Sequence, residues 1–206
     1  MAILPVIKYG HPMLRRKAEK CRANEISADF IADLVRTMYA EDGVGLAATQ
    51  VDVGKMILVA RDPEKDTLHV LVNPVITAMS EKMVNDMEGC LSLPKLQAEV
   101  PRAFRIEVKA MDPEGRNLYL KAKDIFARIL QHEIDHLNGI LYIDRANLST
   151  LVWLVRDKSA ETEEIKKIPT SLAEVQARYK DLYHRDRNQI VFQPQKSLKD
   201  RLAIHS

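Results

Sequence analysis

The residues best suited to chemistry lie in the segment Gln131–His136, where His132 and His136 are four positions apart. Residues four apart share one face of an α-helix, so both imidazoles can bind a single metal ion. Glu133 follows the first histidine and can reach a water molecule on that metal. The motif predicts metal-dependent hydrolysis. The alternative is a pair of hydrogen-bonded core histidines beside a salt-bridged glutamate.

A third metal ligand must come from elsewhere in the chain. Cys90 lies in the segment Glu88–Pro94 and is the best-placed soft donor, although a buried structural cysteine is the alternative. One cysteine and two histidines form an accepted set for a catalytic metal with an open fourth position. The other cysteine, Cys21, has basic neighbours, and we expect a semi-exposed free thiol there.

A further segment, Gly43–Gln50, contains two glycines and two alanines, so its backbone can approach a ligand closely. It lacks the spacing and the lysine of a phosphate-binding loop. Gln50 at its end can donate a hydrogen bond and polarise a carbonyl group. The alternative is a simple turn after a helix.

The elements that must position these residues follow from hydrophobic periodicity. Apolar spacing predicts a buried helix from the N-cap Asp124 to the stop at Asn138, and another helix that begins at Ser27. Strands are expected at Met56–Ala60, at Leu68–Met79 with a bend at Asn73-Pro74, at Phe104–Met111 and at Asn117–Ala122. Helices are expected at Leu151–Arg156 and Leu172–Tyr183. This order predicts an α+β fold in which antiparallel sheets pack around a central metal-binding helix, with a helical C-terminal extension.

Length and composition place the chain among ordinary globular proteins. It has 206 residues, 29% charged residues and a formal charge of +2, which is too small to imply binding to DNA. No apolar run is long enough to cross a membrane, and the first residues do not resemble a leader. We therefore expect a cytoplasmic protein, or an organellar one if a transit peptide was removed.

Three segments in order resemble the motifs of the peptide deformylase family: Gly43–Gln50, Glu88–Ser92 and Gln131–His136. Further matches are His11–Arg15 and Leu137–Leu141, with Asp144 after them, so the resemblance covers about residues 3–148. It implies a catalytic domain over residues 1–148 and a C-terminal helical extension or tail over residues 149–206. The implied reaction is hydrolysis of the formyl group from the N-terminal formyl-methionine of newly synthesised polypeptides, which releases formate.

The resemblance also implies the roles of individual residues. The metal ligands would be Cys90, His132 and His136. The ion would be one Fe²⁺ per chain, with Zn²⁺, Ni²⁺ or Co²⁺ able to replace it; the ligand chemistry by itself favours zinc. The catalytic residues would be Glu133, Gln50 and Leu91, the last through its backbone N–H. We expect the substrate methionine to contact a set of residues consisting of Val44, Gly45, Glu88, Ile125 and Ile129. We also expect Glu88 to pair with Arg102 and brace the Cys90 segment.

Two parts of the chain depart from the family. Many members have glycine after Pro94, where this chain has Lys95, which leaves the contacts beyond methionine open. Residues 149–206 could dock at the ribosome near the exit tunnel, form a solvated tail or pack in a dimer.

Two other functions compete with deformylation. A metallopeptidase would share the helix but need a different third ligand. A protein that binds metal or the ribosome without catalysis would not need Gln50, Cys90 and Glu133 together.

Overall fold

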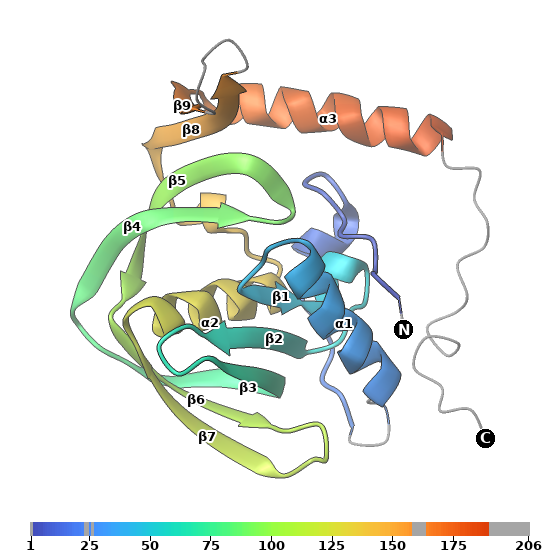
Figure 1. The fold of residues 1–206 in the computed structure, drawn as a ribbon, viewed down its shortest axis with the longest axis vertical. Coiled ribbons are helices and arrows are strands. Elements are labelled where there is room, and N and C mark those ends of the chain that lie inside the picture. Colours follow the sequence, from blue (N-terminus) through green and yellow to red (C-terminus); the bar gives the residue numbers. More distant parts are fainter. Residues whose placement is uncertain (1, 23–24, 26, 158–163, 190–206) are drawn as a thin grey trace.

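Two antiparallel sheets enclose the helix that carries His132 and His136 (Figure 1). The structure is a computed structural model, and it describes residues 2–22, 25, 27–157 and 164–189. The strand order is β1-β2-β3-β6-β7 in the first sheet and β4-β5-β8-β9 in the second. The predicted α+β class with antiparallel sheets is confirmed. No helix in the described part of the chain is long and apolar enough to cross a membrane.

The first sheet is covered by a helix on each face. Its strands are β1 (Gly45–Ala47), β2 (Ile57–Asp62), β3 (Thr67–Met79), β6 (Arg105–Met111) and β7 (Asn117–Lys123). Alternate residues of β2 belong to two cores: Leu58 packs with α2 (Asp124–Leu137), whereas Ile57 packs with α1 (Ala28–Ala40). A strand buried on both faces reads as a continuous apolar run, as Ile57–Ala60 does.

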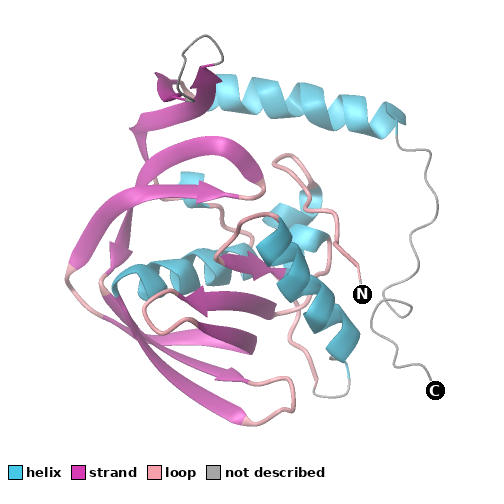
Figure 2. Ribbon diagram, in the orientation of Figure 1, coloured by secondary structure: helices cyan, strands magenta, loops and turns pink. Residues whose placement is uncertain are grey.

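The second sheet lies on the other side of α2 and carries the C-terminal part of the chain (Figure 2). It contains β4 (Met83–Cys90), β5 (Leu93–Ala103), β8 (Asn147–Asp157) and β9 (Glu164–Pro169), and α3 (Leu172–Gln189) follows. Short 3-10 helices occupy Pro12–Arg15, Ala48–Val51 and Tyr142–Asp144. The core of this half includes Val175 and Tyr179 of α3, both buried against the β5 side.

Helix α2 is buried along almost its whole length, from Phe126 to Leu137. It begins at Asp124, one residue before the start implied by an Asp124 cap, and Lys123 holds the cap position. It ends at Leu137 with Asn138 as the C-cap, which confirms the predicted stop at Asn138, and Gly139 then adopts a φ of +74°. A Cβ on Gly139 would lie 2.8 Å from the Arg15 backbone, so this turn requires glycine.

The C-terminal region differs from the prediction in one segment. Residues Leu151–Arg156 form part of strand β8 and not a helix. Leu96 of β5 pairs with Trp153 of β8, and this pairing decides the conformation of a short apolar run that periodicity leaves ambiguous. The helix predicted at Leu172–Tyr183 is confirmed within α3. The predicted division at residue 148 falls inside β8 and stays a prediction.

The surroundings of Cys21 also differ from expectation, because its side chain is buried and not semi-exposed. Its backbone exchanges two hydrogen bonds with the side chain of Asn73, at 2.9 and 2.8 Å. Asn73 has a φ of +51° at an irregularity in β3, which is the bend predicted at Asn73-Pro74. Burial raises the pKa of the Cys21 thiol to about 11, so this cysteine remains a protonated core residue.

Candidate metal centre and active site

Three potential metal ligands from two distant segments converge beside α2. One donor atom each from Cys90, His132 and His136 lies within 4.8 Å of the others. The Cys90 Sγ and the His136 Nε2 are 3.2 Å apart. Ligands on one tetrahedral ion, at bond lengths of about 2.3 and 2.0 Å, would be separated by about 3.5 Å, so the donor set fits such an ion.

The protonation of the two histidines also fits metal binding. Burial lowers the pKa of His136 well below its ordinary value, which favours the neutral imidazole that ligates metals. Burial also lowers the pKa of His132, but contacts with Cys90 and Glu88 more than offset this and raise it overall. A metal would compete with that proton. His132 also stacks on Tyr142, with ring centroids 6.0 Å apart, which fixes the plane of its ring.

Glu88 orients His132 and is itself held by two arginines. Its carboxylate accepts a hydrogen bond of 2.9 Å from His132 Nδ1, so Nε2 of that ring is left for a metal. Arg102 contacts both oxygens, at 2.9 and 3.0 Å, which confirms the predicted pair. Arg128 adds a contact of 2.7 Å. Burial would raise the pKa of Glu88, but hydrogen bonds from His132 and Arg102 hold it well below its usual range.

Glu133 lies beside the three potential metal ligands, and one of its carboxylate oxygens is left unpaired. Its Oε2 is buried and has no hydrogen-bond partner among the described residues. Burial raises the pKa of Glu133 to about 7, although the nearby His132 partly opposes this shift. A carboxyl group with such a pKa can take up and release a proton near neutral pH.

Gln50 and Leu91 both line the same cavity next to Cys90. The Gln50 Oε1 accepts a hydrogen bond of 2.9 Å from the Ala47 N–H, so its Nε2 must face the cysteine loop. That Nε2 lies 3.5 Å from Cys90 Sγ and 3.3 Å from Ser92 Oγ. A fixed amide donor next to the metal ligands is suited to stabilising developing negative charge.

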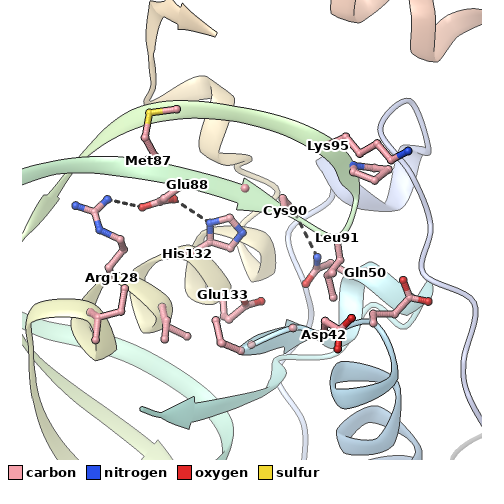
Figure 3. A pocket seen from close by; sticks show the side chains of 18 of the residues that line it. Asp42, Gln50, Met87, Glu88, Cys90, Leu91, Lys95, Arg128, His132 and Glu133 are labelled. Atoms are coloured by element: carbon pink, nitrogen blue, oxygen red, sulfur yellow. Dashed lines mark hydrogen bonds and ion pairs between the residues drawn. The ribbon is translucent and has the colours of Figure 1, made fainter. Parts of the chain in front are cut away.

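A cavity of about 470 Å³ opens onto this centre (Figure 3). All the residues predicted to contact substrate line it: Val44, Gly45, Glu88, Ile125 and Ile129. Gln50, Cys90, Leu91, His132 and Glu133 line it too, whereas His136 lies behind them and is almost fully buried. Figure 3 shows Glu88 between Arg128 and His132, and Gln50 facing Cys90.

Comparison with known proteins agrees with this geometry. The model of the polypeptide deformylase family matches residues 3–151. The chain belongs to this family. Over 146 residues it is 43% identical to peptide deformylase 1 of Clostridium acetobutylicum, which covers 70% of this chain and 95% of that protein. Over 177 residues it is 39% identical to the peptide deformylase of Symbiobacterium thermophilum, with 84% and 81% covered.

Solved structures of the family show the same fold. A class I type b peptide deformylase from Acinetobacter baumannii matches with a TM-score of 0.68 and 37% identity, over 70% of this chain and all of that one. The enzyme from Thermus thermophilus matches with a TM-score of 0.66 and 44% identity, over 69% and 85%. Deformylases are metal-dependent hydrolases that remove the formyl group from the N-terminus of nascent polypeptides, and this is the activity of the chain.

Three further residues around the centre, Arg128, Asp135 and Ser92, were not predicted from the sequence. Arg128 binds Glu88 and also donates to the carbonyl groups of Val100 and Val84, at 2.8 and 2.6 Å. Arg128 precedes His132 by four residues, so the sequence alone places it on the same helical face as the histidines. Asp135 pairs with Arg102 behind the helix, and Ser92 accepts a hydrogen bond from Gln50. The partners of Asp135 and Ser92 are distant in sequence, so the sequence alone does not reveal them.

Because Gly45 has no side chain, the side chain of Glu133 can occupy the space next to it. A Cβ at Gly45 would lie 2.5 Å from Glu133 Oε1 and 2.8 Å from its Cγ. The substitution Gly45→Ala must therefore displace the carboxylate, and we expect kcat/KM for deformylation to fall by about 100-fold with the metal retained. Steady-state kinetics and metal analysis would test this.

The matched control for that substitution is Gly54→Ala. A Cβ at Gly54 would meet only Met13 side-chain atoms at 3.5 Å, an ordinary contact. Its kinetics should equal those of the unmodified chain. If Gly45→Ala also left kcat/KM unchanged, the position of Glu133 would not matter for the reaction.

Proposed function

We propose that Cys90, His132 and His136 hold one Fe²⁺ ion per chain, with Zn²⁺, Ni²⁺ or Co²⁺ able to replace it. The observation that carries this proposal is the convergence of three metal-ligating donor atoms within 4.8 Å, next to a buried carboxylate. A thiolate and two imidazoles suit iron and zinc, and the resemblance to deformylases favours iron.

We assign a separate step of hydrolysis to each residue around the proposed metal site. When bound, the ion would lower the pKa of a water molecule and so supply a nucleophile at neutral pH. Glu133 takes the proton of the attacking water and then delivers it to the leaving amine. The Gln50 Nε2 and the Leu91 N–H donate hydrogen bonds to the oxygen of the formyl group as negative charge develops on it. Formate and a free N-terminal amine are the products.

The same cavity provides a binding site for methionine. Val44, Ile125 and Ile129 supply apolar contacts, and the stem of Glu88 completes the wall. Val44 and Ile125 are 48% and 41% exposed, so a bound methionine side chain would remove apolar surface from water. Gly45 also lines the cavity, and its backbone can pair with the substrate main chain.

The wider setting follows from the substrate. We propose that the chain acts in the cytoplasm, because the bacteria that contain its relatives synthesise polypeptides there. We also propose that residues 149–206 contact the ribosome near the exit tunnel. Residues 1–148 would be the catalytic domain and residues 149–206 an extension, a division supported by the family match that ends at residue 151.

Formate release from a formyl-methionyl dipeptide tests this proposal. Protein purified without oxygen should release formate, and removal of the metal with a chelator should abolish the activity. Stoichiometric Fe²⁺ should restore it more fully than Zn²⁺. If protein with one ion per chain released no formate, the proposed roles of these residues would be wrong. If Zn²⁺ restored more activity than Fe²⁺, only the assignment of the metal would fail.

A further inference from the structure

A short N-terminal segment contacts both the 3-10 helix that carries Gln50 and the turn that follows Cys90. This segment, Ile7–Tyr9, is called the N-terminal strap below. The Ile7 N–H donates to the carbonyl oxygen of Gln50 at 2.8 Å, and the Tyr9 N–H donates to that of Ser92 at 2.9 Å. The strap therefore ties together two segments that are about forty residues apart in the sequence.

Lys8, in the middle of the strap, reaches the residue between Cys90 and Ser92. Its Nζ donates a hydrogen bond of 3.0 Å to the carbonyl oxygen of Leu91, and the contact is partly buried. Hydrogen bonds from a charged donor are about twice as strong as those between neutral groups. The lysine must also give up side-chain freedom to make this contact, which an exposed lysine would keep.

The hydrogen bond from Lys8 restrains the peptide plane that joins Leu91 to Ser92, because a carbonyl group lies in one plane with the N–H of the next residue. The Leu91 N–H belongs to the preceding peptide plane. Holding the second plane limits the directions of this N–H to those that the φ and ψ angles of Leu91 allow. On the Cys90 side, the Ser92 N–H lies 3.4 Å from Cys90 Sγ, and Ser92 Oγ accepts from Gln50. Among the described residues, Lys8 is the side chain that donates a hydrogen bond to the Leu91 carbonyl.

The C-terminal part of the chain holds the strap in place. The Tyr9 ring packs edge-on against Tyr179 of α3, with centroids 5.5 Å apart and an interplanar angle of 89°. Tyr179 is 3% exposed and also stacks on Trp153 of β8 at 6.3 Å. The buried aromatic contact restrains Tyr9 and, with it, the neighbouring Lys8.

We propose that Lys8 is a positioning residue for deformylation. Its ammonium group, through the Leu91 carbonyl, holds the Leu91 N–H in the direction from which it stabilises the formyl oxygen. This inference rests on the role assigned to Leu91 under the proposed function. Lys8 also lines the cavity, and a lysine that bound a substrate carboxylate there would change KM and not kcat.

Steady-state kinetics of two variants test the proposal. Lys8→Met keeps the length of the side chain and removes the donor, and kcat should fall about tenfold while KM stays within about twofold. Removing an oxyanion donor outright costs about 100- to 1000-fold, and a misdirected donor should cost less. Lys8→Arg keeps a charged donor and should recover kcat to within about threefold. The control Lys17→Met removes one exposed charge and should leave both constants unchanged.

Amide exchange gives a second measurement that does not depend on turnover. In Lys8→Met the Leu91 N–H should exchange with solvent several-fold faster than in the unmodified chain, because its segment is less restrained. Unchanged kcat, unchanged exchange, equal losses in the Met and Arg variants, or a change confined to KM would each overturn the proposal. Absence of formate release from the unmodified chain would instead count against the proposed function, and the exchange rates would still test the strap.

Discussion

Replacing Glu133 with alanine is expected to lower kcat for deformylation by about 10²- to 10⁴-fold, the usual contribution of a positioned acid–base group. Cys90, His132 and His136 remain, so the variant should still bind one metal ion per chain. The protein should be as stable as the unmodified chain or more stable, because a buried carboxylate with an unpaired oxygen is costly. Kinetics, metal analysis and chemical denaturation on the same preparation would measure all three effects.

Glu133→Gln separates proton transfer from packing. The amide has the shape of the carboxylate but cannot take up a proton, so its kcat should be as low as that of Glu133→Ala. If Glu133→Gln kept more than about a tenth of the activity, Glu133 would not act by general acid–base catalysis. Loss of the metal in either variant would show that Glu133 supports the metal site itself.

Arg102→Ala should have the largest effect on stability. Arg102 is 3% exposed and binds Glu88 through two nitrogens and Asp135 through a third. Removing one partner from a buried charge network leaves uncompensated charges, at a cost of about 3–5 kcal/mol in the free energy of unfolding. Deformylase activity should fall as well, because Glu88 orients His132, one of the proposed metal ligands. Denaturant unfolding monitored by circular dichroism would give the change.

Arg145→Ala is the matched control for this effect. Arg145 also binds Asp135, at 2.7 and 2.8 Å, but its side chain is 46% exposed. Solvent screens such a pair, so its loss should cost no more than about 1 kcal/mol. If Arg102→Ala and Arg145→Ala lowered the free energy of unfolding equally, the contacts of Arg102 with Glu88 would not add to stability.

The parts of the site that depend on local spacing were predictable from the sequence. His132 and His136 share a helical face because they are four residues apart, and the apolar stripe beside them indicated a buried helix. The strand positions at residues 56–79 and 104–122 followed from alternation and from strong turns such as Asp112–Gly115. Cys90 could be paired with the histidines by its chemistry, although its position in space depends on the pairing of β4 with β5.

The remaining features depend on contacts between distant segments. The sequence predicts a helix at Leu151–Arg156, but six mostly apolar residues do not distinguish a helix from a strand. The pairing with β5 makes this segment a strand. Cys21 lies among basic residues in the sequence, but the fold buries it beside Asn73. Lys8 carries no local pattern at all, and only the folded chain brings it to Leu91.

The hairpin of β8 and β9 also has a consequence for solubility. β5 is covered by β8, and the sheet ends at β9, whose exposed Lys166 and Lys167 and final Pro169 discourage pairing with another chain. A chain shortened at residue 151, where the family match ends, would lose most of β8 and all of β9. The part of β5 that pairs with Val152 and Trp153 would then be an open edge, so we expect the shortened chain to aggregate more readily than the full chain.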